Sequence, residues 1–176
     1  MPIYASAGES KTFEPAPAGT HQAVCVDVID KGMVETQFGK KHKIDMAWQI
    51  AELRNDGKPF LVFKRYTLSL HEKANLRHDL QSWRGKPFTP EEEARFDVET
   101  VIGANCLINV QHHQVGDKTY ANVMSVMPLL KGMAKIVPST DYVRVCNRPT
   151  DTPAEPHQEP APDERPMDVD EDPIPF

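Results

Sequence analysis

Residues 41–53, KHKIDMAWQIAEL, decide the fold of this chain. Apolar side chains recur in it at every second position, at Ile44, Met46, Trp48 and Ile50, and the positions between them form a separate set. A period of two is typical of a β-strand, because successive side chains point to opposite faces of a sheet. The stretch therefore predicts a strand whose apolar face is directed at a core.

The residues before this stretch predict a strand that pairs with it as a hairpin. Val24, Val26 and Val28 alternate with other side chains over residues 24–29, which predicts a strand with one buried face. The polar residues that follow, with glycines at positions 32 and 39, predict a connector between the two strands. Residues 1–19 are rich in alanine, proline, glycine and serine, so we expect an irregular arm there.

Three further strands are expected after residue 53. Residues 55–58, NDGK, are typical of a turn, and residues 59–70, PFLVFKRYTLSL, predict the third strand. The fourth and fifth strands are expected at residues 105–115 and 118–127, joined by a Gly-Asp turn. The periodicity fades after Pro128.

A helix is expected between the third and fourth strands. Leu76, Leu80 and Trp83 fall on one helical stripe, so we expect all three, Trp83 included, in the core. Thr89 followed by Pro90 and two glutamates predicts the start of a second, short helix. The signals that bound the first helix are Ser69 and Glu72 as a capping box before it, and Gly85 and Pro87 after it.

Three strands, a helix and two strands is the element order of an OB-fold. This fold is a five-stranded Greek-key barrel, and its helix lies between strands three and four. Other small α+β folds share the order. We expect one such mainly β domain over residues 20–148.

The residues that could carry chemistry do not form the pattern of an enzyme or a metal site. The three cysteines are far apart and lack a Cys-x-x-Cys pair, so we expect reduced thiols rather than disulfides or zinc ligands. His112 and His113 are neighbours on a strand, so their side chains point to opposite faces and cannot share a metal. No nucleophile is accompanied by a plausible base. We therefore expect neither a cofactor nor catalysis.

Charge is divided unevenly along the chain. The sequence holds 26 acidic and 20 basic residues, and nine of the acidic residues but only one arginine lie in residues 151–176. The rest of the chain is mildly cationic, as suits a domain that meets phosphates. Prolines and carboxylates leave residues 149–176 too little apolar surface for a core, so we expect a disordered, acidic tail.

Two parts of the sequence resemble known families. Residues 64–89, KRYTLSLHEKANLRHDLQSWRGKPFT, and residues 116–129, GDKTYANVMSVMPL, resemble small phage-encoded single-stranded DNA-binding proteins, with similarity over residues 17–130. The resemblance implies an OB-fold that coats single strands during phage replication, recombination or repair. It also implies a location in the cytoplasm of a bacterial host. The sequence shows neither a secretory signal nor an apolar run long enough for a membrane span, so no membrane partner is expected.

The last ten residues, MDVDEDPIPF, resemble the C-terminal tip of bacterial single-stranded DNA-binding proteins. That resemblance implies that the end of the tail binds replication and repair enzymes of the host or the phage. Pro173 departs from the bacterial pattern, which usually has another aspartate there. The roles implied are an aromatic end in an apolar pocket, formed by Ile174, Pro175 and Phe176, and an acidic run along a basic ridge, formed by Asp168, Asp170, Glu171 and Asp172.

Binding a single strand without sequence preference requires cations for the phosphates and aromatic faces for the bases. In an OB-fold these groups lie on strands two and three and on the loops between strands one and two and strands four and five. The candidates at such positions are Lys40, Lys41, Lys43, Trp48, Phe63, Lys64, Arg65, Tyr66, His112, Lys118 and Tyr120.

Side-chain parity leaves alternatives open among these candidates. Trp48 shares its face with apolar residues and is either a core residue or a stacking platform. On the third strand, one of two pairs is structural: either Lys64 with Tyr66, or Phe63 with Arg65. Tyr120 serves either base stacking or cross-strand packing.

Two functions are compatible with the sequence. The first is sequence-independent binding of single-stranded DNA, with partner enzymes recruited through the tail. The alternative is a protein-interaction adaptor that captures host enzymes with the tail and uses the barrel as a scaffold. The sequence does not reveal whether the chain associates with itself.

Overall fold

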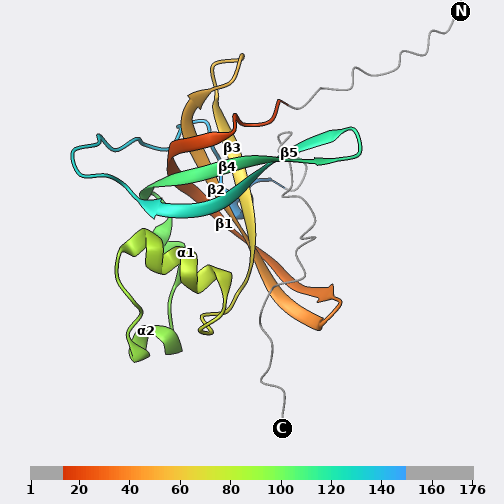
Figure 1. Cartoon of the computed structure of the whole chain (residues 1–176), viewed down its shortest axis with the longest axis vertical. Helices are drawn as coiled ribbons and strands as arrows, with labels where there is room; N and C mark the ends of the chain where they lie inside the picture. The colour runs from red at the N-terminus through yellow and green to blue at the C-terminus, as the bar shows by residue number, and fades with distance from the viewer. Residues whose placement is uncertain (1–13, 150–176) are drawn as a thin grey trace, which may run out of the picture.

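The computed structural model describes residues 14–149 of the chain (Figure 1). Most of the expected arm and nearly all of the expected acidic tail lie outside the described residues, so the predictions for them stay predictions. The described residues form a mainly β structure, as expected. Its elements are β1 (Gly19–Thr36), β2 (Gly39–Leu53), β3 (Pro59–Thr67), α1 (Asn75–Arg84), α2 (Pro90–Ala94), η1 (Val98–Val101), β4 (Asn105–Val115), β5 (Lys118–Pro128) and η2 (Val145–Asn147).

The five strands form one antiparallel sheet in the order β3-β2-β1-β4-β5. The sheet is not closed, although its two edge strands come close to each other: Lys64 Nζ on β3 donates to the carbonyl oxygen of Met124 on β5 at 3.4 Å. Helix α1 contacts both edge strands (Figure 1). Within the described residues, no helix is long and apolar enough to cross a bilayer.

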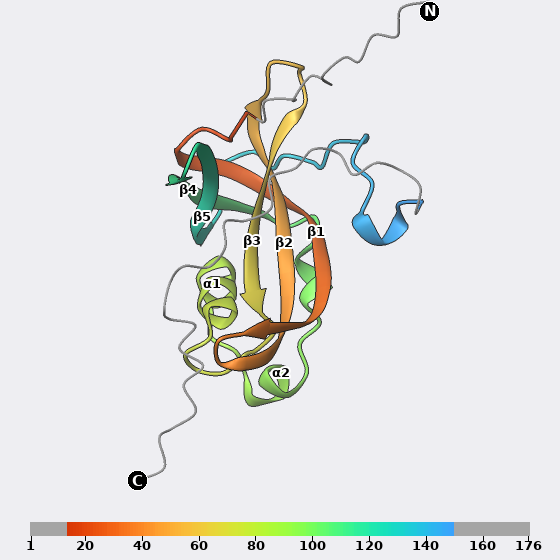
Figure 2. The ribbon, with the colours of Figure 1, turned by 90° about the vertical axis from the view of Figure 1, so that its right-hand side faces the viewer.

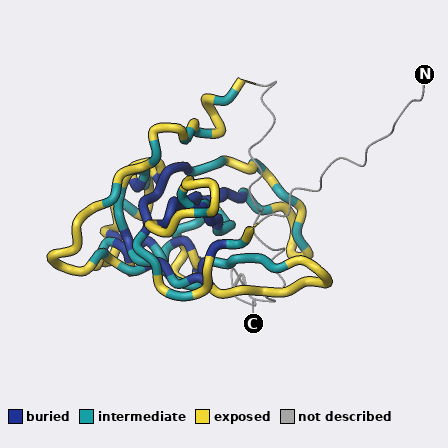
Figure 3. The backbone as a smooth tube through the Cα atoms, turned by 90° about the horizontal axis from the view of Figure 1, so that it is seen from above, coloured by how far each residue is buried: buried dark blue, intermediate teal, exposed yellow. Residues whose placement is uncertain are grey.

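The inner face of the sheet carries the main core. Ile44, Met46, Trp48 and Ile50 on β2 are almost completely buried there, which confirms the period of two. Leu76, Leu80 and Trp83 of α1 belong to the same cluster. The rings of Trp48 and Trp83 lie 6.3 Å apart between centroids, so the helix is joined to the sheet by a pair of large aromatic side chains. Figure 3 shows the buried segments gathered at the centre.

The prediction that the first strand has only one buried face is wrong. Val24 and Val26 belong to a second apolar cluster on the outer face, while Cys25 between them belongs to the inner core. The register of β1 against β2 shifts between Cys25 and Asp27 and again between Asp30 and Gly32. Each shift is a β-bulge that inserts one residue into β1 and so reverses the faces of the residues beyond it.

The predicted polar connector is part of a long hairpin. β1 and β2 stay paired as far as Thr36 and Gly39, with only Gln37 and Phe38 in the turn. This end of the hairpin projects from the body as a two-stranded ribbon (Figures 1 and 2). Both faces of the ribbon meet solvent, so it lacks the apolar alternation that identifies a half-buried strand. From here on, we call residues 30–43 the arm; this hairpin is separate from the irregular N-terminal arm expected at residues 1–19.

Two of the three helix-boundary signals agree with the structure. Gly85 ends α1 in the left-handed conformation at φ 68°, and Thr89 forms a capping box with Glu92 at the start of α2. The capping box predicted at Ser69 is wrong. The Ser69 hydroxyl accepts from His71 N in a local turn, and α1 begins at Asn75 without a side-chain cap.

Residues 129–148 form an irregular segment that crosses the outer face of the sheet. Apart from the short η2, these residues have no helix or strand. Ile136 and Tyr142 pack on the outer apolar cluster, and Ser139 N donates to Gln49 Oε1 on β2 at 2.7 Å. We call this segment the strap; it covers the second buried face of the sheet.

Candidate nucleic-acid interface

The outer face of β2 and β3 divides into a covered and an open part. Under the strap lies the apolar cluster with Ala47 of β2 and Phe63 of β3, and Phe63 is only 5 % exposed. Toward the arm the same face carries Lys43, Asp45 and Arg65. The part that the strap leaves uncovered is therefore charged, although Lys43 and Asp45 are themselves only 6 % and 2 % exposed.

A single buried carboxylate organises this charged part. Asp45 is only 2 % exposed, and it accepts from Arg65 Nε at 2.7 Å and from Arg65 Nη2 at 2.9 Å. Lys31 Nζ, on the second bulge of β1, lies 3.6 Å from the same carboxylate. Lys43 Nζ donates to Thr67 Oγ1 on β3 at 2.7 Å. Two cations, Lys31 and Arg65, thus contact one anion, and the buried Lys43 lies next to them on the same face; we call Lys31, Lys43 and Arg65 the cationic group.

The arm extends this arrangement on one of its faces. Side chains alternate along β2, so Lys41 lies on the same face as Lys43, whereas Lys40 and His42 lie on the other. On that other face His42 Nε2 contacts Asp30 Oδ1 at 2.7 Å, and Lys40 stands opposite Glu35. The structure therefore separates Lys40 from Lys41, although they are neighbours in the sequence.

The pKa of the Asp30 carboxyl lies below its usual range. The main cause is the hydrogen bond from Gly32 N at 2.7 Å, and the contact with His42 adds to it. The carboxylate is therefore kept in its charged form on the face of the arm that also carries Glu35.

The structure resolves the alternatives on the third strand. Lys64 Nζ and the Tyr66 hydroxyl both donate to Asp79 Oδ2 of α1 at 2.6 Å, and Tyr66 is buried. Burial, followed by the charge of Asp79, raises the pKa of the Tyr66 hydroxyl well above its usual range. Lys64 and Tyr66 are therefore the structural pair, which corrects their assignment to the binding surface. Phe63 and Arg65 are the pair on the outer face.

Trp48 needs the same correction. Its side chain is completely buried in the inner core, so it offers no face on which a base can stack. Of the two alternatives, it is the core residue.

The β4–β5 hairpin brings some predicted residues together and separates another. Tyr120 stands opposite His113, and Lys118 opposite Val115, so Tyr120 and Lys118 share one face of the hairpin. Tyr120 is partly exposed and Lys118 exposed. His112 lies on the other face, where its Nε2 contacts the carbonyl oxygen of Ala16 at 2.7 Å. His112 thus holds the chain segment before β1.

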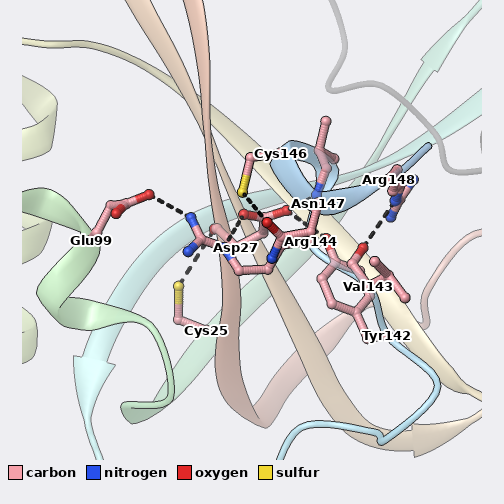
Figure 4. A network of polar contacts seen from close by, with 10 residues as sticks. Cys25, Asp27, Glu99, Tyr142, Val143, Arg144, Cys146, Asn147 and Arg148 are labelled. Carbon is pink, nitrogen blue, oxygen red and sulfur yellow. Dashed lines mark hydrogen bonds and ion pairs between the residues drawn. The ribbon is translucent and has the colours of Figure 1, made fainter. Parts of the chain in front are cut away.

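Sequence reasoning missed the residue that anchors the strap. Asp27 is only 1 % exposed, and its carboxylate accepts from Tyr142 Oη at 3.1 Å, Arg144 Nε at 3.1 Å and Val145 N at 2.8 Å (Figure 4). Arg144 also pairs with Glu99 of η1. Burial, then the charge of Asp27, raises the pKa of the Tyr142 hydroxyl above its usual range. An aspartate inside an apolar run was the available signal, because such a carboxylate needs partners.

The cations on the outer face of the sheet and arm can attract an anionic ligand. No group of three or more potential metal-ligating side chains occurs in residues 14–149. A search of protein-family models found none that matches the chain, and no curated protein matches it.

Proposed function

We propose that this protein binds single-stranded DNA without sequence preference, and that its curved sheet is an OB-fold barrel. The strand order β3-β2-β1-β4-β5, with α1 in contact with both edge strands, supports this fold. In such a barrel the outer side of strands two and three, flanked by two loops, meets the nucleic acid. Here that side carries the cationic group, and both flanking hairpins project from the same side of the body (Figure 1).

The observation that carries the proposal is the separation of charge between the two faces of the arm and sheet. Lys31, Lys41 and Arg65 reach the surface on one face, above the buried Lys43, with a single carboxylate, Asp45, among them. On the other face of the arm, His42 contacts Asp30, and Lys40 stands opposite Glu35. A row of cations on one face suits a phosphate backbone, because each neutralised phosphate releases a counterion.

Aromatic side chains at the ends of the two hairpins would meet the bases. Phe38 in the turn of the arm is 63 % exposed, and Tyr120 lies beside Lys118 on the β4–β5 hairpin. Stacking on such rings contributes about 1–3 kcal/mol for each base and tolerates any sequence. Phosphate binding by the arm and stacking at the hairpins together account for affinity without base-specific contacts.

Charge reversal on the arm tests this function, because the chain provides a matched pair of adjacent lysines. Lys41→Glu should weaken binding to an oligo-dT probe by roughly tenfold at low salt and reduce the salt slope of log K by about 1–2 units. Lys40→Glu makes the same charge change on the opposite face and should weaken binding by less than about threefold. Fluorescence anisotropy over a salt series measures both values.

Two results would contradict the proposal. One is that the unaltered chain fails to bind the probe at low salt. The other is that both variants lose affinity equally, because the effect would then come from net charge and not from the face.

The adaptor function is the second candidate, and one observation favours it. Both cations of β3 are already paired, Lys64 with Asp79 and Arg65 with Asp45, which lowers the charge available for phosphates. Deletion of the last eight residues separates the two functions. For the DNA-binding function, the truncated chain keeps or gains affinity for oligo-dT and loses its partner enzymes. Lys41→Glu without any loss of function would favour the adaptor, because Lys41 lies on the proposed binding face.

A further inference from the structure

The strap hides the apolar half of the proposed DNA-binding face. Phe63 lies two residues from Arg65 on the same face of β3, beside the cationic group. An aromatic ring at this position would suit base stacking, but the strap residues Ile136 and Tyr142 pack on the cluster that contains it. Access to Phe63 therefore depends on the strap.

The strap is attached to the sheet through side chains and not through a β-ladder. Ile136 N donates to Asn105 Oδ1 at 2.9 Å, Ser139 N to Gln49 Oε1 at 2.7 Å, and Val145 N to Asp27 Oδ2 at 2.8 Å. The backbone–backbone hydrogen bonds of the strap, such as Tyr142 N to Ser139 O at 3.1 Å, join strap residues to one another. The strap can therefore leave the sheet without breaking a strand pairing.

Most apolar side chains of the strap face solvent. Ile136 and Tyr142 are the two that pack on the outer cluster. Segments with few buried apolar contacts and exposed backbone open at a lower free energy than the rest of a fold. The solvent-facing side chains and their exposures are Leu130 at 63 %, Met133 at 36 %, Val137 at 83 %, Val143 at 48 % and Val145 at 36 %.

We propose that the strap is a hinged cover that opens when a single strand binds, so that bases reach Phe63 and the apolar cluster around it. This inference rests on the proposed function. The Asp27 carboxylate, with Tyr142, Arg144 and Val145 as its donors, is the latch that holds the closed state (Figure 4). A strand that binds the open state more tightly shifts the population toward it.

Hydrogen exchange on the full-length protein tests the cover directly. The amides of Ile136, Ser139 and Val145 are protected in the closed state by the three side-chain acceptors. With saturating oligo-dT, exchange of peptides from residues 134–148 should become at least tenfold faster. Peptides from β2 serve as the control, because their ladder bonds persist in either state.

Each result of this experiment has a separate meaning. Faster exchange of the strap on DNA binding supports the cover. Unchanged or slower exchange while oligo-dT is bound overturns it, because the strap is then a fixed wall of the binding site. An absence of oligo-dT binding overturns the proposed function itself, and the binding signal shows this independently.

A latch variant gives a second measurement. Tyr142→Phe removes one hydrogen bond to Asp27 without a change in net charge. Because less free energy is then spent on opening, oligo-dT affinity should rise by about two- to fivefold. Unchanged or lower affinity in a folded Tyr142→Phe protein contradicts the cover.

Discussion

The two faces of β2 are held in place by different interactions. On the inner face Ile44, Met46 and Trp48 are buried against apolar side chains, so the stabilising term is the removal of apolar surface from water. On the outer face Asp45 and Gln49 are almost equally buried, yet each has specific hydrogen-bond partners. Burial alone therefore does not identify the core of this sheet; the type of partner does.

The largest expected effect is at the inner face. Trp48→Ala should lower the free energy of unfolding by roughly 3–5 kcal/mol, because it leaves a large cavity beside Trp83. Urea denaturation measures the loss. Trp48→Phe is the control and should cost less, because Trp48 Nε1 is buried without a hydrogen-bond partner within the described part of the chain. A Trp48→Ala protein of normal stability that failed only in DNA binding would reverse our correction of this residue.

A smaller effect is expected at the outer face. Asp27→Ala removes the acceptor of three strap donors, and it should lower the free energy of unfolding by about 2 kcal/mol. Arg144 is partly exposed and keeps Glu99 as a partner, which limits the loss. Limited proteolysis within residues 134–148, together with urea denaturation, gives the measurement. A loss as large as that of Trp48→Ala would show that the strap belongs to the cooperative core.

The third expected effect is confined to high pH and is absent at neutral pH. Burial raises the pKa of the Cys25 thiol to about 12, whereas its usual value is 9.0. Between these values the unfolded chain releases the proton and the folded chain retains it, so stability falls as pH rises through this window. The slope from this thiol is at most about 1.4 kcal/mol per pH unit.

A variant isolates this contribution. Cys25→Ala should flatten the fall in the free energy of unfolding above pH 9.0. Thermal or urea unfolding at several pH values provides the test. An unchanged slope would mean that the inner face admits water to the thiol.

The sequence predicted the inner face well because that face depends on local periodicity. The burial of Ile44, Trp48 and Leu80 can be predicted from their spacing alone. The expected order of strands and helix along the chain came from runs of the same kind. The strap could not be predicted in this way. Its contacts join residues far apart in the sequence, such as Asp27 and Tyr142, and no spacing rule connects them.

The candidate site was predicted in part. The cationic residues Lys43 and Arg65 lie together on the outer face. This agrees with the alternative in which Lys64 and Tyr66 are the structural pair of the third strand. Lys31 was missed because the second bulge brings it to that face, and a bulge interrupts the parity from which side-chain directions are inferred. Lys64 was assigned to the surface because its partner Asp79 lies on a separate helix.

The two bulges in β1 affect how the length of this strand can vary. Val26 and Lys31 are the bulge residues, which have no directly opposite residue in β2. Both lie on the outer face. Loss of a residue at either bulge leaves every other side chain on its present face. Loss of one between them, such as Val28, moves Ile29 and Asp30 to the opposite face. The strand can therefore lose a residue at a bulge without exchanging the inner and outer faces of this part of the sheet.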